Sequence, residues 1–175
     1  MRLERVTGGG HPLYEKALAL YCISFPPHEQ REAASQVKIL GDAEYHFSLI
    51  RDGELFVGLV LYWETDSFVY VEHFCILPEL RGRKYGQSAL KLLAGSGKPV
   101  ILEIDPPVDE ISVRRKGFYE RCGFAENPYP HVHPPYHKGN AGHDLVVMSY
   151  PCPIPQTAYD AFRHSLNSHV MADVC

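Results

Sequence analysis

The stretch from Val69 to Gly97, VYVEHFCILPELRGRKYGQSALKLLAGSG, decides how this chain folds. Its first eight residues are β-branched, aromatic or otherwise apolar, with polar interruptions at Glu72 and His73, and this pattern predicts a largely buried strand. Pro78 ends the strand, because a proline cannot donate to a central ladder. Apolar residues then recur at helical spacing over residues 86–94, and a Gly-Ser-Gly run ends that helix.

The turn between this strand and this helix is suited to holding an anion. The main-chain amides from Gly82 to Gln87 precede the first helical hydrogen bonds and lie at the positive end of the helix dipole. Arg81, Arg83 and Lys84 add positive charge around them. Such a cradle fits a pyrophosphate.

The same turn resembles the acyl-CoA signature of the GNAT superfamily of N-acyltransferases, which reads Gln/Arg-x-x-Gly-x-Gly/Ala before a helix. Arg81 matches the first position and Gly86 the last. Lys84 stands where the family carries the middle glycine, whose missing Cβ permits close contact with a phosphate. The resemblance implies that the diphosphate of coenzyme A binds here.

A second stretch, FYERCGF from Phe118 to Phe124, is similar to the GNAT segment Phe-Tyr-Glu-x-x-Gly-Phe. It closes a helix predicted over residues 108–124, with Ser112 as a candidate N-cap and Gly123 as a C-terminal cap. An apolar strand is predicted between the two motifs, over Pro99–Asp105. Two motifs in the family's order are far more specific than either alone, and the similar layout extends over residues 44–150.

The remaining elements complete a fold prediction. A first strand is expected at the N-terminus, helices over residues 12–24 and 29–40, and an antiparallel hairpin around Asp52-Gly53. A last strand over residues 144–150 precedes a final helix. With the GNAT resemblance, these elements predict an α/β (α+β) fold: a mixed, mostly antiparallel central sheet of six to seven strands, with a parallel pair at its centre, flanked by four to five helices.

Size and composition predict one domain over residues 1–175. Apolar residues make up 45% and charged residues 22%, which is ordinary for a soluble globular protein. A net charge of −4 argues against broad nucleic-acid binding, and no apolar run approaches the length of a membrane span. A cytoplasmic location is expected, because in addition the N-terminus lacks a charged start followed by an apolar core. Reduced thiols are expected, because the cysteines are widely spread, odd in number and form no C-x-x-C pair. The five are Cys22, Cys75, Cys122, Cys152 and Cys175.

The resemblance implies an N-acetyltransferase that moves an acetyl group from acetyl-CoA to a primary amine. Direct transfer in a ternary complex is expected, because no cysteine is clearly placed as a covalent nucleophile. In GNAT enzymes the tyrosine of Phe-Tyr-Glu often points beside the sulfur, and Tyr119 matches it. Tyr119 is therefore the candidate acid that protonates the departing thiolate. The alternative is a core tyrosine with its hydroxyl bonded to main chain.

Coenzyme A is expected to bind mainly through main-chain groups. The end of the strand before the turn can pair with the pantetheine arm like an added strand. Ser112 stands where family members often carry an asparagine that contacts coenzyme A, although a capping role explains a serine equally well. The candidate coenzyme-binding residues are Phe74, Cys75, Ile76, Leu77, Arg81, Gly82, Arg83, Lys84, Tyr85, Gly86, Gln87, Ser112 and Tyr119.

The acceptor amine must lose its proton before it attacks a thioester. A lysine-like amine with a pKa near 10.4 costs roughly 4–5 kcal/mol to deprotonate at neutral pH, so the site needs a base or a pocket that lowers the amine's pKa. Glu72 and Glu103 interrupt apolar strands and are the candidate bases, since burial there is expected to raise the carboxyl pKa. Either could instead face solvent or pair with an arginine. His73 is a weaker alternative.

Two polar segments have further interpretations. Four histidines, His131, His133, His137 and His143, precede the last strand, but no cysteine or carboxylate pattern completes a zinc site, so no metal is predicted. We expect this loop to line the acceptor pocket, with its histidines and Tyr136 selecting the substrate.

Near the N-terminus, Glu29, Arg31 and Glu32 either line a cleft or form a solvated first helical turn, and the solvated turn is favoured.

Other functions stay open from sequence alone. The first alternative is a non-catalytic acyl-CoA-binding sensor or interaction module, which the replacement of a glycine by Lys84 leaves open. The second is metal-dependent hydrolysis at the histidine loop, which would require bound zinc. The expected partners are acetyl-CoA and an amine acceptor, with no nucleic acid and no membrane, in a monomer or homodimer. The acceptor itself cannot be identified from these residues.

Overall fold

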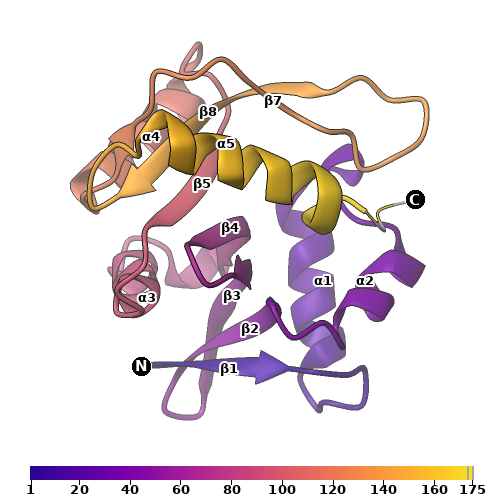
Figure 1. Ribbon diagram of the computed structural model, residues 1–175. Helices are drawn as coiled ribbons and strands as arrows, with labels where there is room; N and C mark the ends of the chain where they lie inside the picture. The colour runs from indigo at the N-terminus through magenta and orange to yellow at the C-terminus, as the bar shows by residue number, and fades with distance from the viewer. Residues whose placement is uncertain (173, 175) are drawn as a thin grey trace.

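A computed structural model describes residues 1–172 and 174, and in them a central sheet forms the core of the fold (Figure 1). Its eight strands follow the order β1-β2-β3-β4-β5-β8-β6, and β7 pairs with β8 beside this path. The strands are β1 (Arg2–Val6), β2 (Tyr45–Asp52), β3 (Leu55–Glu64), β4 (Val69–Ile76), β5 (Val100–Ile104), β6 (Ala125–Glu126), β7 (His131–His133) and β8 (His143–Tyr150).

The centre of the sheet carries one parallel pair. β4 and β5 run parallel, while the other strand pairs are antiparallel. The parallel register covers only Val69–Val71 against Val100–Leu102. Beyond Val71, β4 continues to Ile76 without β5 beside it, so the two strands separate. The mixed sheet with a central parallel pair is confirmed; the short strands β6 and β7 bring the total above the six to seven expected.

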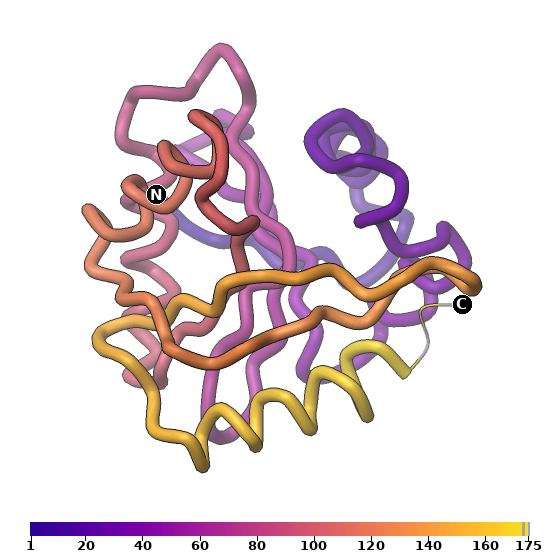
Figure 2. The backbone as a smooth tube through the Cα atoms, turned by 90° about the horizontal axis from the view of Figure 1, so that it is seen from above, coloured from indigo at the N-terminus to yellow at the C-terminus, as the bar shows by residue number. Residues whose placement is uncertain are grey.

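Helices cover both faces of the sheet (Figures 1 and 2). One face packs against α1 (Tyr14–Ser24), α2 (Ala33–Ile39) and α5 (Gln156–Ser165), which continues as a π-helical turn over Leu166–Val170. The other face packs against α3 (Tyr85–Ala94) and α4 (Glu110–Arg121). Two 3₁₀ turns connect successive elements: Pro27–Glu29 lies between α1 and α2, and Pro78–Leu80 lies between β4 and α3. The five helices agree with the predicted number.

Two local predictions are wrong. The helix expected over residues 29–40 is a 3₁₀ turn followed by a shorter helix, because Gln30 and Glu32 adopt extended main-chain conformations. Ser112 is not the N-cap of α4. Asp109 caps that helix by accepting hydrogen bonds from the amides of Ile111 and Ser112, and the Ser112 hydroxyl accepts in return from the Asp109 amide at 3.1 Å. This reciprocal pattern is a capping box.

The cysteines of the described residues agree with the sequence expectation. Cys22, Cys75, Cys122 and Cys152 are free thiols. Cys175 lies outside the described residues. Among the helices that the structure describes, none has the length and apolar character needed to cross a bilayer.

Candidate active site

A large cavity of about 1630 Å³ opens where β4 and β5 separate. Its walls come from β4, the end of β5, the turn into α3, helix α4 and the loop before β8. Segments far apart in the chain therefore face one space. One end of the cavity lies at the basic turn, and the other lies at the histidine-rich loop.

Most of the predicted coenzyme-binding residues line this cavity. Three do not: Leu77, Arg83 and Ser112. Ser112 is only 3% exposed and is occupied by the capping box, so its contact with coenzyme A is not supported. The residues brought together are Phe74, Cys75, Ile76, Arg81, Gly82, Lys84, Tyr85, Gly86, Gln87 and Tyr119.

The basic turn keeps glycine-like geometry despite the missing glycine. Lys84 is the N-cap of α3 and adopts a left-handed conformation with φ of 64°, and Gly82 has φ of 76°. The first hydrogen bond of α3 runs from the Ser88 amide to Lys84 O at 3.0 Å. The amides before it have no carbonyl one turn earlier in the helix. The main chain therefore presents donors at the helix N-terminus, as an anion site requires.

Gly86 is required for packing. A Cβ at this position would lie 3.1 Å from the ring of Phe118 and 3.5 Å from the ring of Phe74. Because real Cβ contacts are rarely this close, the glycine lets α3 approach α4 and β4. The last glycine of the motif therefore holds the turn against the cavity wall.

A β-bulge explains why two consecutive polar residues of β4 lie on the same face. Leu61 of β3 pairs with His73 and Tyr62 pairs with Val71, which leaves Glu72 as the extra residue. A bulge reverses the alternation of side chains along a strand. Glu72 therefore contacts Trp63, and His73 contacts Tyr21, both on the face covered by α1 and α5.

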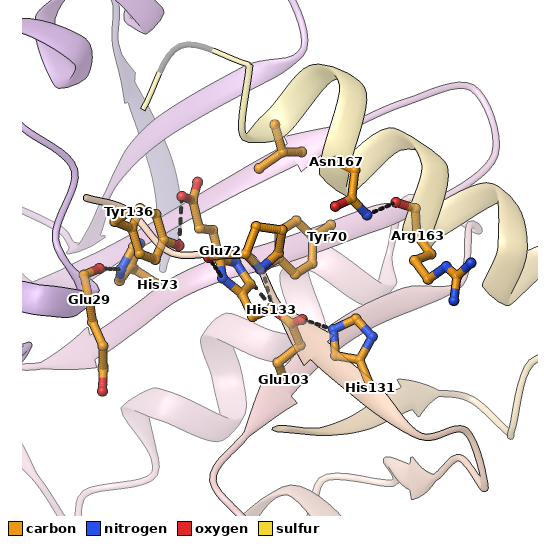
Figure 3. A network of polar contacts seen from close by, with 12 residues as sticks. Glu29, Tyr70, Glu72, His73, Glu103, His131, His133, Tyr136, Arg163 and Asn167 are labelled. Atoms are coloured by element: carbon orange, nitrogen blue, oxygen red, sulfur yellow. Dashed lines mark hydrogen bonds and ion pairs between the residues drawn. The ribbon is translucent and has the colours of Figure 1, made fainter. Parts of the chain in front are cut away.

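The side chain of Glu72 is fully buried, and both of its oxygens accept hydrogen bonds. It accepts hydrogen bonds from Arg31 Nε at 2.9 Å and from Trp63 Nε1 at 2.8 Å. It also accepts one from the Tyr136 hydroxyl at 3.0 Å (Figure 3). Burial alone would raise the pKa of this carboxyl, but the charge of Arg31 and these hydrogen bonds hold it below its ordinary value. The expectation of a raised pKa is wrong for Glu72, because the structure supplies a buried cation.

Arg31 also corrects the prediction for the segment before α2. Its side chain is 1% exposed, and Nη2 donates to Val170 O at 2.6 Å. Glu29 lines the cavity, while Glu32 is exposed. The favoured interpretation of a solvated first turn is wrong for Arg31, which is buried against Glu72, and for Glu29, which lines the cavity.

Glu103 is the centre of a second buried network. Its carboxylate accepts hydrogen bonds from the Tyr70 hydroxyl and from His131 Nε2, and His133 Nε2 lies 3.8 Å from Oε2. Figure 3 shows both histidines pointing toward this carboxylate. Burial would raise the pKa of Glu103, but His133, His131 and Tyr70 together lower it. A raised pKa is therefore wrong for Glu103 as well.

His73 lines the cavity within an aromatic cage. Its Nε2 lies 2.9 Å from Glu29 O, and its ring packs against Tyr21, Phe25 and Tyr136. Burial lowers the pKa of His73, which keeps the ring neutral at neutral pH.

Tyr119 lies in the wall of α4 that faces the cavity, and is 8% exposed. Burial raises its pKa to about 12, although the charge of Arg115 acts in the opposite direction. The phenol is therefore protonated across the physiological pH range and can donate a proton or hydrogen bond.

His133 is the residue whose environment the sequence did not reveal. It is 4% exposed, lines the cavity and stacks on Tyr136 with ring centroids 5.0 Å apart. The spacing His-x-His was the only signal, because it places two side chains on one face of a strand. The partner carboxylate lies 28 or more residues away in the chain, so sequence pattern alone could not indicate it.

Glu29, Asp105 and His143 form an ionic cluster at the cavity. Their candidate ligand atoms lie within 4.8 Å of one another. Asp105 Oδ2 forms an ion pair with Arg115 Nη1 at 2.5 Å, and Asp105 Oδ1 lies 3.5 Å from His143 Nε2. Burial raises the pKa of Glu29, and the charge of Asp105 adds to this effect. With a cationic partner in place, the cluster is explained as ion pairing, and it gives no support to zinc-dependent hydrolysis.

The comparison with known families agrees with this geometry. The model of the acetyltransferase (GNAT) family matches residues 11–124, which is more than half of the chain. The chain belongs to the GNAT family. It is therefore an acyltransferase with the mixed GNAT sheet, and the resemblance seen at the two motifs is confirmed.

Individual relatives agree with the family. A solved structure described as a "putative acetyltransferase from GNAT family" from Bacteroides thetaiotaomicron is 32% identical, with a TM-score of 0.91 over 98% of both chains. The "putative acetyltransferase YjbC" of Bacillus subtilis is 32% identical over 69 residues, which span 38% of this chain and 35% of that relative. An aminoglycoside 6'-N-acetyltransferase complexed with coenzyme A shares the fold, with 14% identity and a TM-score of 0.58 over 89% of this chain and 100% of that one.

Proposed function

We propose that this GNAT protein is an N-acetyltransferase that moves the acetyl group of acetyl-CoA to a primary amine by direct transfer in a ternary complex. The observation that carries the proposal is a single cavity that joins the basic turn to the Glu72 and Glu103 networks, with Tyr119 in its wall. Both substrates can therefore occupy one space. No transfer between separate sites is needed.

The residues at the basic turn fit coenzyme A. Its diphosphate would bind the amides that precede Ser88, with Arg81 and Lys84 adding positive charge. The pantetheine arm would lie along residues 74–76, where β4 has β3 on one side and has lost β5 on the other. That main-chain edge is available for an added strand.

Tyr119 is proposed as the acid that protonates the departing thiolate. Its pKa of about 12 keeps the proton in place until it is needed. Burial raises the pKa of the Cys75 thiol, which also lines the cavity. We expect burial to raise the pKa of the coenzyme A thiol in the same way, and this reduces the difference between that pKa and the pKa of Tyr119. The hydroxyl then regains its proton from water.

The thiols support direct transfer over a covalent acetyl-cysteine. Cys75 and Cys122 line the cavity, and burial raises the pKa of both. The thiolate is the nucleophilic form of cysteine, so raised pKa values keep both residues unreactive at neutral pH. A cytoplasmic location and a monomer or homodimer remain predictions from the sequence.

The proposal is tested by coenzyme binding and turnover together. Isothermal titration calorimetry with coenzyme A and acetyl-CoA measures binding, and thiol release measures transfer to a panel of spermidine, kanamycin, lysine and an Ala-terminated peptide. Binding with amine-dependent thiol release is the expected result. Binding without thiol release for any amine would favour the non-catalytic sensor, and no binding would overturn both.

A further inference from the structure

We propose that His133 is the catalytic base that accepts the proton of the acceptor amine, and that Glu103 positions it. This inference rests on the proposed function and assigns a residue that the family motifs do not include. The sequence indicated Glu72 or Glu103 for this role. The structure favours His133 through its tautomer, its unpaired nitrogen and the occupied state of the competing groups.

The tautomer of His133 follows from one contact. Its Nδ1 lies 2.6 Å from the carbonyl oxygen of Pro134. A carbonyl oxygen can only accept, so Nδ1 carries a hydrogen and donates it. In the neutral ring, Nε2 is then the nitrogen with the free lone pair.

That lone pair has no partner. His133 Nε2 is buried and makes no hydrogen bond in the described part of the chain, although the residue lines the cavity. A buried polar atom without a partner is uncommon, and it is costly unless a ligand or water satisfies it. The missing partner is a donor, and an amine N–H is a donor.

The competing groups are occupied. The Glu103 carboxylate accepts from Tyr70 and His131, the Glu72 carboxylate accepts from three donors, and the pKa of each is lowered. A carboxylate with a lowered pKa is a weaker base than an ordinary one. Both ring nitrogens of His131 also have partners, Glu103 and the Tyr159 hydroxyl at 3.0 Å.

The surroundings of His133 suit a ring that becomes positively charged. The Glu103 carboxylate, 3.8 Å from Nε2, is the nearest anion and stabilises an imidazolium. Tyr136 stacks on the ring from the same loop, and its hydroxyl donates to Glu72, which is paired with Arg31. His73 on β4, His131 on β7 and Tyr70, which donates to Glu103, are the other titratable groups of this region, and the pKa of His73 is partly lowered by the charge of His133.

The proton balance of the reaction is complete without a further reagent. As the amine nitrogen forms a bond to the acetyl carbon, His133 Nε2 takes one N–H proton. As the carbon–sulfur bond breaks, Tyr119 gives its proton to the sulfur. Imidazolium and phenolate then return to their starting states by proton exchange through water. An amine that binds as an ammonium ion releases one additional proton to water before it attacks.

Two variants separate a base from a structural histidine. His133→Asn retains a side-chain N–H that can donate to Pro134 O but lacks Nε2, and His133→Ala leaves space for free imidazole. We expect kcat/KM to fall about 100-fold in both, with coenzyme affinity by calorimetry unchanged. Added imidazole is expected to restore activity to His133→Ala. His164→Asn, on the exposed surface of α5, is the matched control and should retain full activity.

The pH profile of kcat/KM distinguishes His133 from Glu103. With the most active amine of the panel, the wild-type protein should lose activity at low pH as the base becomes protonated, and this acid limb should disappear in His133→Asn. In Glu103→Gln the limb should persist but move to lower pH, because the imidazolium loses its anionic neighbour. Disappearance of the limb in Glu103→Gln, with the limb intact in His133→Asn, would assign the base to Glu103.

Each outcome decides one question. Wild-type kcat/KM in His133→Asn with an unchanged acid limb would overturn the His133 assignment and leave the acetyltransferase proposal standing. Absence of coenzyme binding and of thiol release in the wild-type protein would overturn the acetyltransferase proposal itself. Urea unfolding of every variant shows whether a loss of activity follows from unfolding, and imidazole rescue of His133→Ala excludes that explanation directly.

Discussion

The two ends of the cavity are built in different ways. The end at the basic turn, proposed as the coenzyme end, is one continuous turn of main chain in which Gly82 and Lys84 both have positive φ and the helix N-terminus supplies the donors. The other end, proposed as the acceptor end, consists of buried side chains from β4, β5, β7 and the segment before α2, which form the Glu72 and Glu103 networks.

This difference shows what each end tolerates. A turn of main-chain amides keeps its geometry through a change of side chain when φ is retained, as it is for Lys84 in place of a glycine. A buried ionic network does not, because removing one partner leaves an uncompensated charge. We therefore expect substitutions at the acceptor end to have larger effects on stability than substitutions in the turn.

The largest effect is expected for Glu72→Gln. Arg31 and Glu72 are 1% and 0% exposed at their side chains, so the variant leaves a buried guanidinium without its counter-ion. The free energy of unfolding should fall by about 3–5 kcal/mol, measured by urea denaturation at pH 7. Glu120→Gln, with a 54% exposed side chain, is the control and should change stability by less than about 1 kcal/mol.

The pH dependence of this loss has a defined sign. Because the pKa of Glu72 is lowered in the folded protein, its stabilising contribution is present above the unfolded pKa of about 4.3 and is lost as pH falls through the folded value. The difference between wild type and Glu72→Gln should therefore shrink below about pH 4. A constant difference from pH 7 to pH 3 would show that lost charge pairing is not its cause.

An intermediate effect is expected for Tyr119→Phe, because this residue lines the cavity but belongs neither to the basic turn nor to the two buried networks. Loss of a general acid should lower kcat by about 100-fold with coenzyme affinity unchanged. Tyr129→Phe, whose hydroxyl donates to Ile154 O at 2.7 Å outside the cavity, is the control and should keep wild-type kcat. Unchanged kcat in Tyr119→Phe across a pH series would remove its acid role.

Tyr119 also has a stability signature at high pH. A folded pKa of about 12, above the unfolded value of about 10, means that its contribution is present below pH 10 and is lost as pH rises through 12. Urea unfolding should therefore show wild type losing stability relative to Tyr119→Phe between about pH 10 and 12.

The smallest effect is expected for Lys84→Gly in the turn. Glycine adopts the left-handed conformation without the Cβ strain, and its greater freedom in the unfolded chain offsets part of that gain. The free energy of unfolding should rise by about 0.5–1 kcal/mol, while coenzyme affinity falls modestly at low salt through the lost charge. Arg83→Gly, at a position without positive φ, is the control and should not stabilise. A less stable Lys84→Gly would contradict the strain argument.

Much of the fold could be predicted from the local sequence pattern. The strand Val69–Ile76, the helix after it and the strand before α4 follow directly from apolar periodicity and from the prolines and glycines that bound them. The parallel pair followed from a strand–helix–strand connection. The interruption of the predicted helix at residues 30–32 could not be predicted, because Arg31 is buried there by its ion pair with Glu72, 41 residues away in the chain.

The candidate site also has a part that could be predicted from the sequence and a part that could not. The proposed anion cradle consists of residues close together in the chain, and most of the residues that the sequence predicted for it line the cavity. The prediction that Ser112 is the N-cap was wrong, and its contact with coenzyme A is not supported. Glu72 and Glu103 were located correctly in the strands, but the lowered direction of their pKa values depends on partners that the pattern could not show.

By itself, the sequence determined the elements of the sheet, the family and the place where coenzyme A is proposed to bind, because these depend on residues close together in the chain. Only the tertiary structure decided which acidic groups are neutralised by cations and which nitrogen is left unpaired, since burial and ion pairing depend on contacts between distant segments. His133 illustrates this difference. Its residue type is visible in the sequence, while its free Nε2 results from the meeting of β5 and β7 with the loop that follows.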